Sequence, residues 1–499
     1  MNRNSMLAQL DENKTWDILI IGGGATGLGA AVDAASRGFS TILIEADDFA
    51  KGTSSRSTKL IHGGVRYLEQ GNLKLVREAL KERGWLLQNA PGVTRKMGFI
   101  IPAFALIQKI YYGAGLKFYD VLSQKLSLGA TKFISNKTIQ KFVPAISQKN
   151  LKGGIVYYDG QFDDARLAID LANTASRHGA VLINYCEAQS LLKKKIKQTD
   201  KQAKVYGAVA YDCINDKTFE IKSKTVINAT GVFVDDIMQM DNKDAADIVT
   251  PSQGIHLVID KKFFPGDHAL MIPKTDDKRV LFAVPWHNKV ILGTTDTEIE
   301  DISDEPSPLQ QEIDFILKHA NRYLNSTITL KDVTSMFAGL RPLVKTKGVT
   351  NTSMLSRDHV IIVSTSNLIT ITGGKWTTYR KMAEDAVNNA IFVAKFPYKN
   401  CVTKHLQIEG STFDNINYND PIEKIYSIEN IKKFIEEEMA ITIEDVLARR
   451  TRLLFLDCKT AVQAAPIVAK NMASLLNRDE HWIQSEIDNF TQLAKNYLP

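Results

Sequence analysis

A glycine-rich turn near the start of the chain, LIIGGGATGLGAAVDAASRG at residues 19–38, restricts the fold more than any other stretch. The apolar run at residues 16–21 is typical of a buried parallel strand. The alanine-rich run at residues 25–37 has helical spacing and ends at Gly38, a residue common after helices. Glycine is needed in between because the chain turns tightly and a ligand can approach bare backbone there. The sequence therefore predicts a strand, a turn and a helix in this order.

The glycines also have the spacing of a dinucleotide site. Gly22, Gly24 and Gly27 follow the pattern G-x-G-x-x-G, which lets a pyrophosphate lie against the N-terminus of the helix. A second strand at residues 40–44 ends at Glu45, where such folds bind the ribose hydroxyls. The alternative is a tight strand-to-helix turn beside an exposed glutamate. Because strand, helix, second strand and acid all occur in order, the pattern favours dinucleotide binding.

Length and composition describe an ordinary globular protein. The 499 residues give room for two or three domains, with 44% hydrophobic and 24% charged residues. The net charge of +6 is interpreted as spread along the chain, with one dense cluster at residues 193–197, so no nucleic-acid partner is predicted. The four cysteines lie far apart and indicate free thiols in a reducing compartment. No metal site is predicted.

The longest apolar stretch, MGFIIPAFALI at residues 97–107, has two interpretations. It is shorter than the roughly 20 residues that a membrane-spanning helix needs. Lys96 and Lys109 flank it, and tyrosines and phenylalanine follow. This mixture suits a surface in the membrane interface, and it equally suits a segment of the core.

The pattern of strands and helices divides the chain into three parts. Segments 1–95, 151–250 and 355–398 are predicted to form one discontinuous nucleotide-binding domain. Segments 96–150 and 251–354 are predicted to form an inserted, β-rich domain that binds substrate. Residues 399–499 are helical and charged, and they are predicted to form a C-terminal domain.

Reactive side chains gather in the stretch that begins at Gly52, GTSSRSTKLIHGGVRYLE. Small hydroxyl residues there let a ligand come close, and Lys59, His62 and Arg66 follow. Each side chain alone has an ordinary structural explanation. Together, beside a dinucleotide turn, they indicate a functional site.

The motifs GGGATG, SSRSTKLIHGGVRYLE, GTTDTE, AGLRPL and ITGGKWTTYRKMAE together resemble a known family. They are similar to those of the FAD-dependent, quinone-linked glycerol-3-phosphate dehydrogenases, which belong to the flavoproteins related to D-amino-acid oxidase. The resemblance covers nearly the whole chain. It implies an α/β fold with a Rossmann-like FAD-binding domain, an inserted β-rich substrate domain and a C-terminal helical domain.

The resemblance implies FAD as the cofactor and a set of residues around it. Positive potential from Lys375 and a helix N-terminus would stabilise the reduced flavin. The implied cofactor-binding residues are Gly22, Gly24, Gly27, Glu45, Ser54, Ser55, Lys59, His62, Gly63, Ala229, Gly231, Gly374, Lys375 and Thr377.

The resemblance also implies the reaction, in which sn-glycerol 3-phosphate is oxidised to dihydroxyacetone phosphate by hydride transfer from C2 to flavin N5. Arginine forks suit a buried phosphate, and a neutral imidazole suits the removal of the hydroxyl proton. The implied substrate-binding residues are Arg66, Tyr67, Arg341, Arg357 and Lys375. The implied catalytic residues are His62, His256, Arg341 and Lys375, and the choice of base between the two histidines stays open.

The electron acceptor is expected to be a membrane quinone, because no second dinucleotide motif is present and an apolar, aromatic strip extends from Phe99 to Tyr119. The expected location is cytoplasmic, on the inner face of the cytoplasmic membrane and in contact with its anionic lipids. Whether the chain forms a homodimer is left open. Other candidates are a glycerol-3-phosphate oxidase that uses oxygen, an amino-acid-type flavin oxidase, and an RNA-modifying flavoprotein.

Overall fold

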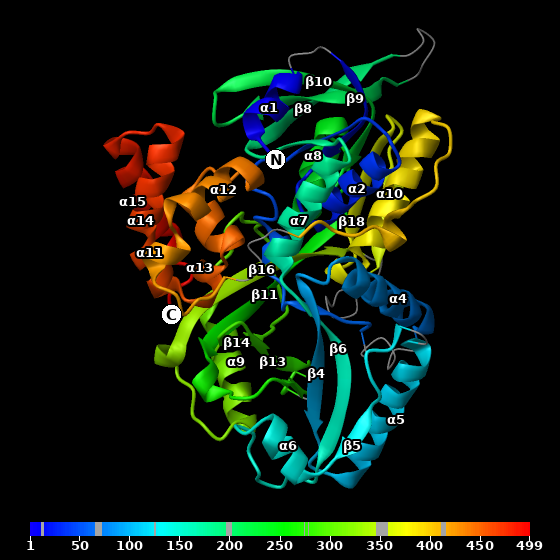
Figure 1. Ribbon diagram of the computed structural model, residues 1–499. Helices are drawn as coiled ribbons and strands as arrows, with labels where there is room; N and C mark the ends of the chain where they lie inside the picture. The colour runs from blue at the N-terminus through cyan, green and yellow to red at the C-terminus, as the bar shows by residue number, and fades with distance from the viewer. Residues whose placement is uncertain are drawn as a thin grey trace.

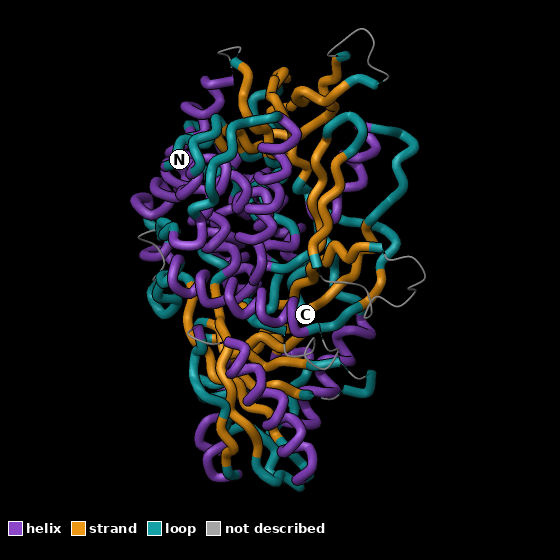
Figure 2. Tube along the Cα trace, turned by 90° about the vertical axis from the view of Figure 1, so that its right-hand side faces the viewer, coloured by secondary structure: helices purple, strands orange, loops and turns teal. Residues whose placement is uncertain are grey.

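Two β-sheets form the framework of the protein and lie one above the other along its long axis (Figures 1 and 2). This computed structural model describes residues 1–10, 14–64, 72–123, 126–195, 202–273, 275–277, 279–345, 358–410 and 416–499. Helices cover both sheets, and a further group of helices lies beside them at the C-terminus.

The upper sheet is mostly parallel and carries the glycine-rich turn. Its main path is β17 (His359–Val363), β18 (Leu368–Gly373), β10 (Lys217–Asn228), β1 (Thr15–Ile21), β2 (Thr41–Ile44) and β7 (Val181–Ile183). The antiparallel strands β8 (Cys186–Lys194) and β9 (Lys204–Asp212) extend it from β10. Ile21 pairs with both Ile44 and Asn228, so the carboxyl ends of β1, β2 and β10 meet at one edge.

Three helices cover the upper sheet because their small and apolar residues face it. They are α2 (Ala25–Ser36), α7 (Asp164–Arg177) and α10 (Tyr379–Ala394), with α2 packed against the other two. The shorter helices α1 (Arg3–Leu7) and α8 (Val234–Asp241) lie at β7 and at β18. The predicted strand, turn and helix are therefore present as β1, the Gly22–Gly24 turn and α2.

The lower sheet is mostly antiparallel. It consists of β15 (Thr297–Glu298), β11 (Val249–Asp260), β14 (Lys289–Gly293), β13 (Leu281–Trp286), β12 (Ala269–Ile272), β4 (Thr94–Pro102), β6 (Gly154–Phe162) and β3 (Leu60–Ile61), with β16 (Val333–Val344) paired to β11 and β5 (Lys132–Ile134) to β6. Helix α9 (Gln310–Tyr323) packs on β11, β13 and β14. Strand β6 lies in this sheet, so the division between the sheets does not follow the predicted boundary at residue 151.

The remaining helices lie around the outside of the two sheets, with the C-terminal group at the left of the view, mostly at the height of the upper sheet (Figure 1). They are α4 (Leu73–Asn89), α5 (Leu106–Ser123) and α6 (Asn136–Phe142), and at the C-terminus α11 (Ile422–Ile425), α12 (Ile428–Glu438), α13 (Leu453–Leu456), α14 (Cys458–Leu476) and α15 (Glu480–Ala494). The C-terminal helices share a buried apolar cluster with Trp286 and Phe337 of the lower sheet. They are thus packed onto the sheet that carries β11 and β16.

The apolar stretch at residues 97–107 divides between two environments. Met97 and Phe99 to Ile101 are buried in β4, which makes this part a core segment. Leu106 and Ile107 begin α5 and are 70% and 71% exposed. The expected apolar surface therefore starts at α5 and does not include β4.

Candidate functional site

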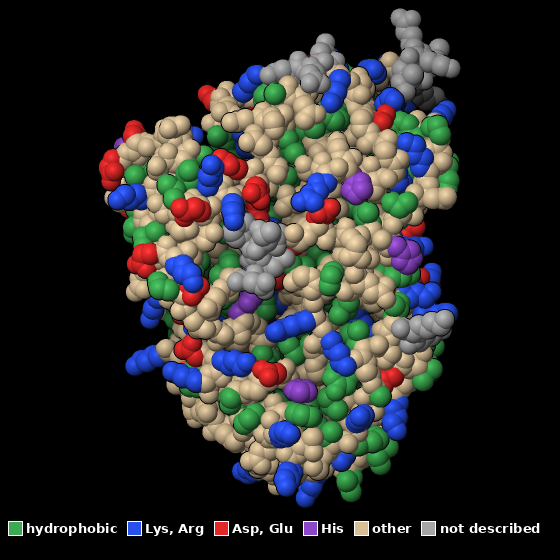
Figure 3. Space-filling model, viewed as in Figure 1, with side chains coloured by type: hydrophobic (Ala, Val, Ile, Leu, Met, Phe, Trp, Pro, Cys, Tyr) green, Lys and Arg blue, Asp and Glu red, His purple; other side chains and the backbone are tan. Residues whose placement is uncertain are grey.

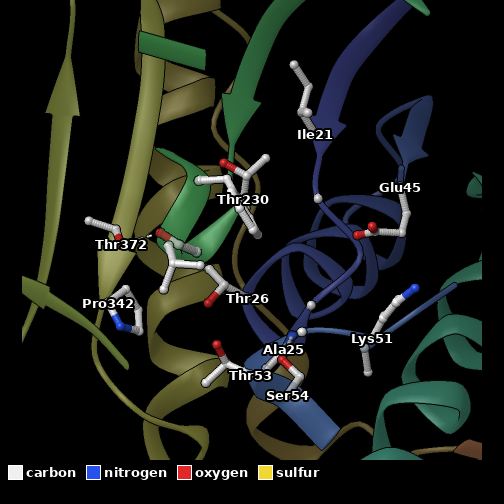
Figure 4. A pocket seen from close by; sticks show the side chains of 18 of the residues that line it. Ile21, Ala25, Thr26, Glu45, Lys51, Thr53, Ser54, Thr230, Pro342 and Thr372 are labelled. Atoms are coloured by element: carbon white, nitrogen blue, oxygen red, sulfur yellow. Dashed lines mark hydrogen bonds between the residues drawn. The ribbon is translucent and has the colours of Figure 1, made fainter. Parts of the chain in front are cut away.

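A cavity of about 640 Å³ opens where β1, β2, β10 and β18 end, at the edge where α/β sheets bind their ligands. Figure 4 shows Glu45 at one end of it, Thr26 and Thr230 in the middle, and Thr372 and Pro342 at the opposite side. The predicted cofactor residues that line this cavity are Gly22, Gly24, Glu45, Ser54, Ala229, Gly231, Gly374 and Lys375. Gly27, Ser55, Lys59, His62, Gly63 and Thr377 lie outside its lining.

The glycine-rich turn presents the N-terminus of α2 to this cavity. Gly22 has φ +108°, a backbone conformation that favours glycine, and a side chain on Gly27 would collide with the carbonyl oxygen of Gly22. The Ala25 amide donates to Ser54 Oγ at 2.9 Å. The N–H groups of a first helical turn and the helix dipole favour a bound anion.

Glu45 is held by backbone donors at the end of β2. Its carboxylate accepts hydrogen bonds from the Gly23 and Asp47 amides, the latter at 3.0 Å. Burial raises the pKa of Glu45 to about 7, although the two amides act in the opposite direction. A desolvated carboxylate in this place suits hydroxyl donors such as those of a ribose.

The Lys59 side chain turns away from the cavity. Its ammonium donates to the Ser55 carbonyl and to Asp164, both at 2.6 Å, and it is fully buried. The rings of Trp286, Phe337 and Phe455 lie 5.0 to 5.4 Å from the ammonium. Lys59 is therefore a fixed internal cation behind the loop that precedes His62.

The residues after Lys59 are tied to α5 and to the short turn Trp376–Thr378 that precedes α10. The His62 amide donates to Thr377 Oγ1 at 3.2 Å, which brings two of the predicted cofactor residues together. The Gly63 amide donates to Tyr119 Oη at 2.8 Å. Tyr119 belongs to α5 and donates in turn to Asp159, which pairs with Arg83 at 2.6 Å.

His256 and Arg341 share one face of the lower sheet. His256 of β11 pairs with Gly293 of β14 and with Phe337 of β16. A side chain on Gly293 would collide with His256, and a side chain on Gly254 would collide with Arg341. The Arg341 guanidinium donates to Thr294 Oγ1 at 3.0 Å and to the Gln253 carbonyl at 3.3 Å. These glycines make room for the two predicted catalytic side chains.

The His256 imidazole is buried and uncharged. Burial lowers its pKa well below the usual value, and the nearby cations Arg341 and Lys59 lower it further. Its Nε2 atom lies 2.8 Å from Thr58 Oγ1, and its ring stacks on Phe337. A neutral imidazole of this kind can accept a proton at neutral pH.

Three predicted substrate residues, Arg66, Tyr67 and Arg357, lie outside the described residues. Other residues around the site were missed by sequence reasoning. Thr58 stands inside the quoted SSRSTK motif, and the C-terminal motif LARRTRLLF contains Arg452 and Phe455, which back the Lys59 loop. The density of arginines in LARRTR was the one signal that could have pointed to them.

Comparison with known proteins agrees with this geometry. A family model described as FAD dependent oxidoreductase matches residues 17–380, and one described as the C-terminal domain of alpha-glycerophosphate oxidase matches residues 421–482. The mitochondrial glycerol-3-phosphate dehydrogenase of Homo sapiens is 38% identical over 541 residues, which cover 98% of this chain and 74% of that protein. The Arabidopsis thaliana mitochondrial enzyme is 36% identical, covering 97% and 86%. The chain belongs to the FAD-dependent glycerol-3-phosphate dehydrogenase family.

Solved structures support the same assignment. The glycerol-3-phosphate dehydrogenase from Bacillus halodurans complexed with FAD is 30% identical, covers 100% of this chain and 98% of its own, and has a TM-score of 0.80. The L-alpha-glycerophosphate oxidase from Mycoplasma pneumoniae, at 18% identity and a TM-score of 0.58, shares the fold. As a member of the glycerol-3-phosphate dehydrogenase family, the protein is an FAD-dependent oxidoreductase, and the predicted family, fold class and cofactor are confirmed.

Proposed function

We propose that the protein oxidises sn-glycerol 3-phosphate to dihydroxyacetone phosphate and passes the electrons to a membrane quinone. The observation that carries the proposal is the similarity, along the full chain, to enzymes named glycerol-3-phosphate dehydrogenase. We keep the division into a nucleotide domain, a substrate domain and a C-terminal helical domain as a proposal, with β6 assigned to the lower sheet.

The cavity at the edge of the upper sheet fits FAD by its donor set. The amides at the start of α2 suit the pyrophosphate, and Glu45 suits the hydroxyls of the adenosine ribose. Gly374 and Lys375, which line the same cavity, would lie toward the flavin and add positive charge. When bound there, FAD supplies a two-electron acceptor for the hydride from substrate C2.

His256 is the better supported base. It is neutral and buried, and it lies on the same face of the sheet as Arg341. On that face its ring contacts Thr58, in the segment between Ser55 and Lys59. We assign it the proton of the C2 hydroxyl, which leaves as the carbonyl of the product forms. His62 keeps its place as a predicted residue of the cofactor loop.

Arg341 is proposed to bind the anionic end of the substrate. Its guanidinium lies over Gly254, which is two residues before His256 on β11 and on the same face of the sheet. Two residues of a strand span about 7 Å, so the guanidinium and the imidazole are separated by about this distance along the strand. A substrate with a hydroxyl and a phosphate a few bonds apart matches this spacing. Lys375, Arg66, Tyr67 and Arg357 remain proposed partners of the same phosphate.

Helix α5 supports the proposed contact with an anionic membrane. Its outer side exposes an apolar row made of Leu106, Ile107, Ile110, Tyr111, Phe118 and Val121. Residues 94–153 contain ten lysines and arginines and the single acid Asp120, so the positive charge is concentrated here and not spread along the chain as first interpreted. Figure 3 shows lysine and arginine side chains dominating the lowest part of the molecule, near α6. Apolar and cationic groups together suit an anionic bilayer surface.

The same surface supports the proposed position on the inner face of the cytoplasmic membrane. No helix among the described residues has the length and apolarity to cross a bilayer. The inner side of α5 contacts Gly63 through Tyr119, which brings the proposed membrane helix next to the cofactor loop. This closeness supports a lipid-dissolved acceptor.

Anaerobic addition of glycerol 3-phosphate to the purified holoenzyme tests the reaction. Bleaching of the flavin absorbance by this substrate, and not by alanine, sarcosine or RNA, is expected. Bleaching by an amino acid would contradict the proposal.

The acceptor is tested by mixing the reduced enzyme with a ubiquinone or menaquinone analogue or with oxygen. Quinone reduction faster than peroxide formation is expected. Rapid peroxide formation without quinone reduction would instead favour an oxidase, the activity named in the C-terminal family model.

A further inference from the structure

Thr58 makes the one hydrogen bond that the His256 ring has within the described part of the chain. Thr58 Oγ1 lies 2.8 Å from Nε2, although the two residues are 198 positions apart. The second ring nitrogen, Nδ1, is buried and has no hydrogen-bond partner among the described residues. The hydroxyl of Thr58 therefore distinguishes one edge of the imidazole from the other.

The other neighbours of the ring cannot make this distinction. Phe337 stacks on the imidazole with ring centroids 4.8 Å apart and planes 23° apart, and Gly293 lies so close to the ring that a Cβ there would collide with Cδ2. Stacking fixes the plane of a ring, but a rotation of 180° about the bond to Cβ gives the same stack. Only a directional contact such as the hydrogen bond to Thr58 selects one of the two orientations.

Thr58 is itself held in place by the residue that follows it. Lys59 has φ +61°, which is uncommon for a residue with a side chain. Its ammonium is fixed by Ser55 and Asp164 and enclosed by three rings, one of which is Phe337, the ring stacked on His256. The fixed Lys59 side chain therefore holds the neighbouring Thr58 hydroxyl within hydrogen-bonding distance of the imidazole.

We propose that Thr58 is a positioning residue for the oxidation: its hydroxyl accepts a hydrogen bond from Nε2–H of the neutral His256 ring, which leaves Nδ1 as the basic nitrogen that receives the proton of the substrate's C2 hydroxyl. The proposal rests on the proposed function, in which His256 is the base. Thr58 contacts the base and not the substrate, so its loss slows the chemical step and leaves substrate binding nearly unchanged.

The test measures flavin bleaching by glycerol 3-phosphate in anaerobic single turnovers of the FAD-loaded enzyme. Thr58→Val keeps the branched shape and removes the hydroxyl, and Thr58→Ala provides a second hydroxyl-free variant. Both are expected to slow bleaching by about 10- to 100-fold, with the half-saturating substrate concentration changed less than about twofold. Thr58→Ser, which restores a hydroxyl, is expected to stay within about threefold of the unmodified enzyme.

A double-mutant cycle separates this role from a general structural one. In a His256→Gln background, Thr58→Val is expected to cause no further loss, because its effect passes through the imidazole. FAD absorbance per protein and the melting temperature, measured for every variant, are expected to match those of the unmodified enzyme.

Three results would overturn the inference while leaving the proposed function intact. They are an unchanged rate in Thr58→Val and Thr58→Ala, a Thr58→Ser variant as slow as Thr58→Val, and an equal loss from Thr58→Val with and without His256. If glycerol 3-phosphate fails to bleach even the unmodified enzyme, the proposed function fails, and the inference fails with it.

Discussion

Helix α5 and the C-terminal segment around Arg449 and Arg450 use charge in opposite ways. Around α5 the cations outnumber the acids greatly, and they stand at the surface beside exposed apolar side chains. In the C-terminal segment the arginines are fully buried. Both segments are rich in basic and apolar residues, yet one faces outward and the other lies inside.

The buried arginines are matched by acids from distant parts of the chain. Asp48, just beyond β2, accepts from both Arg449 and Arg450, with one Arg450 contact at 2.9 Å. Arg452 pairs with Asp163, the N-cap of α7, at 2.8 Å. The comparison shows that charge pairing decides whether basic side chains are buried or exposed. Arginines paired with carboxylates can be buried, whereas a group of cations without acidic partners stays in contact with water.

The largest expected effect comes from breaking the buried network with Arg450→Met. Asp48 then loses its closest partner inside the protein, and we expect the unfolding free energy to fall by about 3–5 kcal/mol. FAD content should also fall, because Asp48 follows the stretch that lines the cavity at Glu45 and Asp47. Urea unfolding and flavin absorbance measure both effects.

The control is Arg177→Met. Arg177 is 65% exposed and pairs with Glu409 on the surface, so a change below about 1 kcal/mol is expected. Equal effects of the two variants would remove the distinction between buried and exposed arginines.

The second prediction concerns acid, which should weaken the buried ion pairs of Asp48 with Arg449 and Arg450. Burial raises the pKa of Asp48, but Arg450 and Arg449 outweigh it and hold the pKa at about 2. A pKa below the unfolded value stabilises the fold above about pH 4, and this stabilisation is lost as the pH falls toward 2. The difference in unfolding free energy between the unmodified protein and Asp48→Asn should therefore shrink by about 1 kcal/mol by pH 3, in urea titrations. A constant difference between pH 6 and pH 3 would mean that Asp48 is not ionised in the network.

A carboxylate introduced into the exposed apolar row of α5 tests whether this helix binds an anionic membrane. Ile110 is 63% exposed in the apolar row, and Ile110→Glu should weaken binding to phosphatidylglycerol-containing vesicles by at least about tenfold. The melting temperature should change little, because most of the side chain is exposed. Phe392→Glu, at an 82% exposed position on α10, serves as the control in vesicle sedimentation. Equal losses in both variants would point to a general effect of charge.

The smallest expected effect is that of a single lysine on α5. Lys117→Gln should lower affinity for the same vesicles about fivefold, since one cation near an anionic surface contributes about 1 kcal/mol. The difference should vanish at high salt, where surface charges are screened. Lys424→Gln, on the C-terminal helix α11 and 69% exposed, should bind as the unmodified protein does.

Much of the fold could be predicted because its signals are local. The turn at Gly22, the strand before Glu45 and helix α2 each follow from neighbouring residues, and the structure contains them. The apolar stretch at residues 97–107 could not be assigned, because its composition fits a core strand and a surface helix equally, and it contains part of each.

The candidate site was harder to predict where its contacts span the chain. The pairing of Thr58 with His256, and of Asp48 with Arg450, joins residues 198 and 402 positions apart, and no local pattern encodes such pairs. Lys59 shows the same limit. Its motif suggested a flavin contact, whereas its ammonium is directed to Asp164 inside the protein.

The hydrogen bond between Tyr119 and Gly63 connects α5 directly to the loop that carries His62. The outer apolar row is thereby one residue away from the backbone of a predicted cofactor-binding residue. Any amphiphile that replaces lipid around α5 during purification is therefore expected to change turnover as well as solubility. Rates measured in different detergents would then describe different states of the reaction centre, and a bilayer is the reference in which they should be compared.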